Sequence, residues 1–87
     1  MLLTAEISFY PLTQDFESRV IEFIRVLRGN PNLKIKTGGT STIICGESDH
    51  VFETLRQAAN ACMSGTNTDV LVIKLLNTDA FDSPEIP

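Results

Sequence analysis

The sequence predicts an α+β fold of the ferredoxin-like βαββαβ type, in which a four-stranded antiparallel sheet carries two helices on one face. Three patterns predict it. Apolar residues alternate with polar ones in the first segment of the chain, and they recur with helical spacing in two later segments. Three further segments have the short apolar runs or the alternation of strands. Because the connections are short and crossovers are right-handed, we expect the strand order 4-1-3-2.

The first strand and the first helix differ in their period. Residues 2–10 alternate apolar and polar side chains until Pro11, which cannot donate a hydrogen bond to a neighbouring strand. Residues 13–28 then place apolar side chains along one stripe, with Thr13 as a candidate N-cap. The GNPN sequence at 29–32 indicates that the helix stops there.

A hairpin is predicted next. Residues 33–37 alternate, with Lys34 and Lys36 pointing outward as a common protection of a sheet edge. The two glycines at 38–39 predict a turn, and residues 40–46 predict the returning strand.

The second half of the chain repeats the pattern of a helix followed by a strand. Residues 49–63 return to helical spacing, with Ser48 or Asp49 as a candidate N-cap, and residues 69–76 form an almost continuous apolar strand. For a chain of 87 residues we expect one domain at 1–78, followed by a loosely ordered tail at 79–87.

Composition and charge exclude several classes of function. The net charge of −4 argues against nucleic-acid binding, which depends on Lys and Arg. No apolar run approaches the roughly 20 residues that span a bilayer, and the N-terminus lacks the features of a signal peptide, so we expect a cytoplasmic protein without membrane insertion. The two cysteines form no CxxC pair, and no metal site or cofactor is expected.

The predicted sheet leaves one face without helices. The last strand has apolar side chains on both faces, and an open apolar face seldom stays in contact with water. We therefore expect a homo-oligomer, either a dimer or a dimer of dimers, that associates through the sheets.

Catalytic motifs are missing from the sequence. His50 is the only histidine, no partner for it is evident, and no GxSxG, HExxH, P-loop or Rossmann fingerprint occurs. These observations favour a protein that is not an enzyme.

Polar side chains gather on two neighbouring strands of the predicted sheet. Glu6, Ser8 and Tyr10 share the helix-free face of the first strand, and the TST sequence at 40–42 opens the third. Buried polar groups need partners, which could be an opposing subunit or a small polar ligand. Strand parity places the first and last residues of TST on one face and the middle residue on the other.

Three segments together resemble the YkoF-like family of thiamine- and hydroxymethylpyrimidine-binding domains. They are ISFYPL at 7–12, TGGTSTIICGE at 37–47 and HVFETLRQA at 50–58, and the resemblance extends over roughly residues 3–77. It implies a ferredoxin-like, single-domain member that binds thiamine or its hydroxymethylpyrimidine moiety, preferably unphosphorylated, in vitamin transport or supply. The alternatives are a regulatory or assembly domain whose open face is only an interface, and a small dimeric enzyme.

The resemblance also implies where the ligand binds. The candidates follow from motif position and strand parity and lie at the sheet or subunit junction: Ser8, Tyr10, Gly39, Thr40, Ser41 and Thr42.

Overall fold

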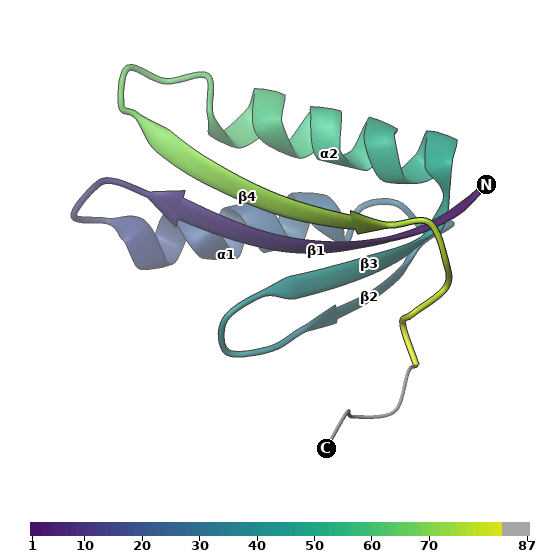
Figure 1. Ribbon diagram of the computed structural model, residues 1–87. Coiled ribbons are helices and arrows are strands. Elements are labelled where there is room, and N and C mark those ends of the chain that lie inside the picture. The colour runs from purple at the N-terminus through teal and green to yellow at the C-terminus, as the bar shows by residue number, and fades with distance from the viewer. Residues whose placement is uncertain (83–87) are drawn as a thin grey trace.

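The predicted βαββαβ architecture is confirmed. A computed structural model describes residues 1–82, so the end of the predicted tail lies outside the described residues. The sheet has the order β2-β3-β1-β4 with every neighbouring pair antiparallel, and Figure 1 shows both helices on one side of it. The elements are β1 (Leu2–Pro11), α1 (Phe16–Leu27), β2 (Lys34–Thr37), β3 (Thr42–Glu47), α2 (Ser48–Cys62) and β4 (Asp69–Leu76).

The core lies between the sheet and the helices. β1 turns its alternate apolar side chains toward the helices, and Ile44 of β3 continues this layer. The helices meet the layer with Phe23 and Leu27 of α1 and with Val51 and Ala58 of α2, all of them buried. Burial of each Val, Leu, Ile or Phe side chain contributes about 1.5–3 kcal/mol, so the strand and helix periods of the sequence are consistent with one core.

Several predicted ends differ from the structure. The N-cap of α1 is Asp15, not Thr13, because residues before Phe16 form a turn. The N-cap of α2 is Glu47, because β3 runs directly into the helix and its last extended residue takes the capping position. Neither predicted cap of α2, Ser48 or Asp49, holds that position.

The third strand begins later than predicted. Residues 38–41 form a loop in which the Gly38 N–H donates to the Ser41 carbonyl at 2.9 Å, and the paired strand starts only at Thr42. β1, by contrast, continues through Pro11, which pairs with Asp69 of β4. The two central strands therefore end at different levels, and this offset shapes the candidate site.

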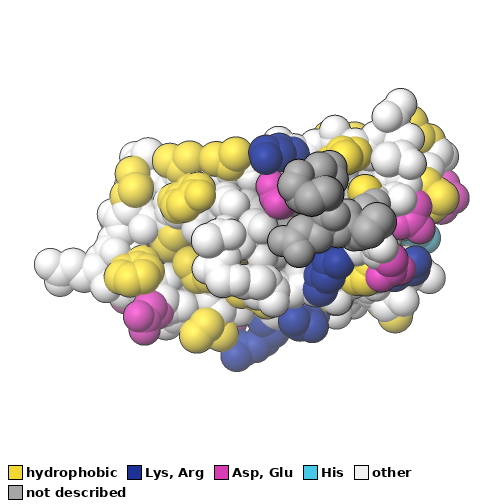
Figure 2. Space-filling model, turned by 60° about the horizontal axis from the view of Figure 1, so that its bottom comes forward, with side chains coloured by type: hydrophobic (Ala, Val, Ile, Leu, Met, Phe, Trp, Pro, Cys, Tyr) yellow, Lys and Arg dark blue, Asp and Glu magenta, His cyan; other side chains and the backbone are white. Residues whose placement is uncertain are grey.

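β4 is an edge strand whose apolar side chains are exposed on both faces. Ile73 and Leu75 point toward the helix layer, yet they are 37% and 46% exposed, because neither helix packs across β4. On the other face Val70 and Val72 are exposed as well. Figure 2 shows several exposed hydrophobic side chains over one end of the molecule, with others at the opposite end and beside basic side chains.

The chain after β4 crosses the helix-free face of the sheet toward β2 (Figure 1). The Thr4 hydroxyl of β1 donates to the Thr78 carbonyl at 2.7 Å and accepts from the Ala80 N–H at 2.9 Å. The Lys36 ammonium donates to the Phe81 carbonyl and lies 4.6 Å from the centre of its ring. Residues 77–82, called the tail segment below, thus contact both β1 and β2.

Candidate functional site

The offset between the two central strands opens a notch in the sheet. β3 pairs with β1 only as far as Ile7, which lies opposite Thr42. The next residues of β1, Ser8–Tyr10, pair with β4 alone, so the side of this segment that faces β3 has no strand partner. Backbone groups on such an edge are available to a ligand that carries its own donors and acceptors.

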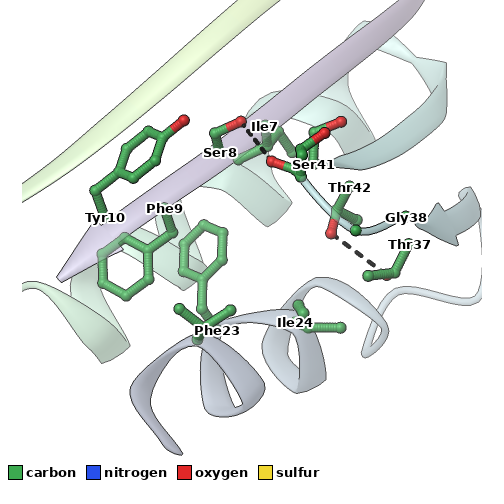
Figure 3. A pocket seen from close by; sticks show the side chains of 13 residues that line it. Ile7, Ser8, Phe9, Tyr10, Phe23, Ile24, Thr37, Gly38, Ser41 and Thr42 are labelled. Carbon is green, nitrogen blue, oxygen red and sulfur yellow. Dashed lines mark hydrogen bonds between the residues drawn. The ribbon is translucent and has the colours of Figure 1, made fainter. Parts of the chain in front are cut away.

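A cavity of about 330 Å³ occupies this notch, with α1 on one side and the β2–β3 loop on the other (Figure 3). Its wall on the helix side is apolar, and includes Phe9 and Phe23, whose rings stack with centroids 4.6 Å apart. Its loop side presents backbone and hydroxyl groups. The lining residues are Ile7, Ser8, Phe9, Tyr10, Val20, Phe23, Ile24, Thr37, Gly38, Gly39, Thr40, Ser41 and Thr42.

The structure brings all six predicted ligand-binding residues to this cavity: Ser8, Tyr10, Gly39, Thr40, Ser41 and Thr42. They come from two regions that are far apart in the sequence: the end of β1, and the loop at 38–41 together with Thr42, the first residue of β3. Their role in binding stays a prediction, and the geometry now assigns all six to one cavity.

The hydroxyl groups of the site differ in their surroundings. Thr42 lies on the helix side of the sheet, is 4% exposed, and shares a hydrogen bond of 3.3 Å with the Thr37 hydroxyl. Ser41 lies on the opposite, helix-free face, where its hydroxyl is 3.5 Å from Glu6 Oε2. The Ser8 hydroxyl donates to the Thr40 carbonyl at 3.2 Å and so ties β1 to the loop.

Strand parity was therefore right for Ser41 and Thr42, which lie on opposite faces. Thr40 and Ser41 both precede β3, which begins at Thr42, so strand parity alone does not fix the position of either residue. The loop lets all three residues border one cavity, which a regular strand would not allow.

A second hollow of about 280 Å³ lies on the helix-free face beside the notch. It shares Ser8, Tyr10, Thr40 and Ser41 with the notch cavity, so the two spaces meet at these residues. Glu6, Val72 and Lys74 complete its lining.

An ion pair holds α1 in place beneath the notch. Arg19 donates to both carboxylate oxygens of Asp69, each at 2.7 Å, and to the Cys62 carbonyl at 2.8 Å. The hydrogen bond from Arg19 holds the pKa of the Asp69 carboxyl below its usual value. This contact joins the start of α1, the end of α2 and the start of β4, and so fixes one wall of the cavity.

Several lining residues were missed from the sequence. Val20, Phe23 and Ile24 belong to the apolar stripe of α1 and were assigned to the core, because nothing local separates a core residue from a cavity wall. Lys74 carried a usable signal, since it is the one charge in the VLVIKLL run of β4 and lies opposite Glu6.

Other polar groups lie apart from the notch. His50 Nδ1 is 3.5 Å from the Asn30 side-chain amide, at the start of α2. Burial raises the pKa of the Cys62 thiol, which disfavours the reactive thiolate. Among residues 1–82, no three His, Cys, Asp or Glu side chains are grouped so as to hold a metal ion.

A family model described as thiamine-binding protein matches residues 5–79, which include the notch and both cavities. The chain belongs to this family. The match confirms the resemblance drawn from the three sequence segments. No curated protein sequence matches the chain.

Solved structures share the fold of this family member. A protein from Streptococcus pneumoniae superposes with a TM-score of 0.83 at 15% identity, over 95% of this chain and 93% of its own. A candidate thiamine biosynthesis/salvage protein from Thermotoga maritima gives 0.75 at 17% identity, over 86% and 82%. A Bacillus cereus domain of unknown function gives 0.76 at 25% identity, over 90% and 77%.

No helix within the described part of the chain is both long and apolar enough to cross a bilayer.

Proposed function

We propose that this protein binds thiamine or its hydroxymethylpyrimidine moiety in the notch and releases it unchanged, as a carrier or a regulator of vitamin supply. The observation that carries the proposal is the notch cavity, in which all six candidate residues meet beside a segment of β1 that pairs with β4 but has no partner on its β3 side. The family to which the chain belongs supports the class of ligand.

The chemistry of the cavity suits an aminopyrimidine. Such a ring is flat, its nitrogens accept hydrogen bonds, and its exocyclic amine donates them. Hydroxyls can donate or accept, and a strand edge without a partner offers backbone donors and acceptors. The volume of about 330 Å³ lies at the lower end of the range for ligand sites, roughly 300–1,000 Å³, which favours one small heterocycle.

The unphosphorylated form is the better fit. Among residues 1–82, no charged side chain lines the notch cavity, and Lys74 is the one cation that borders the neighbouring hollow. A pyrophosphate is usually bound by several basic groups or by a helix N-terminus.

The proposal includes a cytoplasmic homo-oligomer, a dimer or a dimer of dimers, that associates through the helix-free faces. Tyr10, Val70 and Val72 are exposed there and would be covered by a second copy. The notch would then lie beside the subunit junction. Sedimentation velocity tests this part, since a monomer at micromolar concentration would contradict it.

Calorimetric titration with thiamine and with hydroxymethylpyrimidine tests the binding. We expect saturable heat and a rise in melting temperature, and chromatography should recover the ligand unchanged. Ser41→Ala should weaken binding by about two- to tenfold, the effect of one lost hydrogen bond of roughly 0.5–1.5 kcal/mol.

The matched control is Ser64→Ala, which removes an exposed hydroxyl in the turn before β4 and should leave the affinity unchanged. If neither compound produces heat or a melting shift at millimolar concentration, the proposed function is wrong.

A further inference from the structure

The notch cavity and the second hollow, called the open-face hollow below, differ in charge. The notch cavity is lined by apolar side chains, hydroxyls and backbone, whereas Glu6 and Lys74 line the open-face hollow. Because both hollows share the residues at the end of β1 and in the loop, a ligand seated in the notch can extend a second part past Ser8 and Ser41 onto the open face.

Glu6 and Lys74 form an ion pair in the structure. They lie opposite each other on β1 and β4, and Lys74 Nζ is 3.3 Å from Glu6 Oε1. The other carboxylate oxygen, Oε2, is 3.5 Å from the Ser41 hydroxyl at the rim of the notch.

The two partners are not equally held. The Glu6 side chain is 40% exposed and lies against Ser41, whereas the Lys74 side chain is 75% exposed. In the single chain this ion pair is exposed and contributes little, and the flexible lysine side chain can turn its ammonium away from the carboxylate. The carboxylate is therefore the fixed member of the pair and the ammonium the exchangeable one.

We propose that Glu6 selects ligands in which a neutral ring, bound in the notch, carries a cationic group. Lys74 pairs with the Glu6 carboxylate until the cationic group of the ligand replaces it. This inference rests on the proposed function and adds a charge preference to it. Thiamine, a neutral aminopyrimidine joined to a thiazolium cation, has this chemistry, whereas hydroxymethylpyrimidine has only the neutral part.

The exchange predicts opposite effects for the two members of the pair. Removal of the Glu6 carboxylate takes the counter-ion from the cationic group of the ligand, while the neutral ring still fits the notch cavity. Removal of the Lys74 ammonium leaves the Glu6 carboxylate free before the ligand arrives, so a cationic ligand should bind more tightly. A merely structural ion pair would instead affect both ligands equally and in the same direction for both substitutions.

The test measures dissociation constants of thiamine and of hydroxymethylpyrimidine at pH 8 for the wild type, Glu6→Gln and Lys74→Met. We expect Glu6→Gln to weaken thiamine binding by about three- to tenfold and to change hydroxymethylpyrimidine binding by less than twofold. Lys74→Met should strengthen thiamine binding by about two- to fivefold.

The control is Glu53→Gln, which removes the same charge on the exposed face of α2, where Glu53 pairs with Arg56. It corrects for the net charge of the protein and should change neither constant. Thermal melting verifies that each variant folds.

The outcomes separate this inference from the proposed function. If Glu6→Gln weakens both ligands equally or neither, or if Lys74→Met weakens thiamine, the charge selection is wrong while the binding of hydroxymethylpyrimidine stands. If the wild type binds neither ligand, both proposals are wrong.

Discussion

The two ends of the helix-free sheet face carry polar residues of β1 in the same alternating pattern, but one end is covered and the other is exposed. β1 places Thr4 at one end of this face and Ser8 and Tyr10 at the other, all by the same alternation. At the first end the tail segment covers Thr4, which is buried. At the second end Tyr10 is 52% exposed, and the hydroxyl of Ser8 borders two hollows.

The difference shows how a polar residue on a central strand can be satisfied. From the sequence, the expected partners were an opposing subunit or a ligand. For Thr4 the partner is the chain itself, because the Thr78 carbonyl and the Ala80 N–H both bond to its hydroxyl. The polar groups at the notch also have partners within the chain, such as the Thr40 carbonyl for the Ser8 hydroxyl, but they border two hollows and are not covered by the tail segment.

The largest effect is expected at the notch end, where Asp69→Asn breaks the support of α1. The Asp69 side chain is 1% exposed, and both its oxygens accept from Arg19. We expect this variant to lower the free energy of unfolding at pH 7 by more than either tail substitution below. Urea unfolding measures the difference.

The pH dependence of this difference has a definite sign. Because the pKa of Asp69 is lowered in the folded protein, the stabilisation is fully present above the unfolded pKa of about 3.9. It is lost as the pH falls through the folded pKa, so wild type and variant should converge below about pH 4. The exposed pair of Glu53 and Arg56 is the control, and Glu53→Gln should cost less. An equal cost for the two variants at pH 7 would contradict the argument.

The next effect is expected at the closed end, the end of the sheet face where the tail segment covers Thr4. Thr4→Val keeps the shape of the side chain and removes its hydroxyl. The variant leaves the Thr78 carbonyl and the Ala80 N–H without their partner. Since the tail segment can lift and let water reach both groups, we expect a loss of about 1 kcal/mol, at the lower end of the cost of an unsatisfied buried group. Hydrogen exchange should become faster at the Ala80 amide. An unchanged exchange rate would mean that Thr4 does not hold the tail segment.

Much of the fold could be predicted because its determinants are local. The alternation of β1, the helical stripes and the short connections indicated the strand order, and motif position indicated the residues of the notch. The notch itself could not be predicted, because it arises from the unequal ends of β1 and β3. The loop that delays the start of β3 contains the bond from the Gly38 N–H to the Ser41 carbonyl, which no sequence pattern indicates.

The contact of Thr4 with the tail segment also lay beyond the sequence patterns. Thr4 and Ala80 are separated by 76 residues, and no periodicity connects them. The same holds for Arg19 and Asp69, since an arginine on a helix and an aspartate at the start of a strand are both ordinary surface residues until the fold brings them together.

The smallest effect is expected for Phe81→Ala, which removes the ring beneath two lysines of β2. Lys36 Nζ lies 4.6 Å and Lys34 Nζ 5.7 Å from the ring centre. Exposed cation–π contacts contribute roughly 0.5–1 kcal/mol, and the backbone carbonyl of residue 81 can still accept from Lys36 in the variant. We therefore expect a loss of about 0.5 kcal/mol and a moderate increase in exchange at the Ala80 amide.

Phe52→Ala is the matched control, because Phe52 is a phenylalanine of α2 that is 50% exposed and belongs to the helix layer, whereas the tail segment contacts β1 and β2. It should leave the Ala80 amide unchanged. If Phe81→Ala also leaves that amide unchanged, the bonds to Thr4 alone hold the tail segment, and the closed end depends on β1 and not on β2. If instead the amide exchanges as fast as in Thr4→Val, the lysines and the threonine act as one unit, and the tail segment attaches or lifts as a whole.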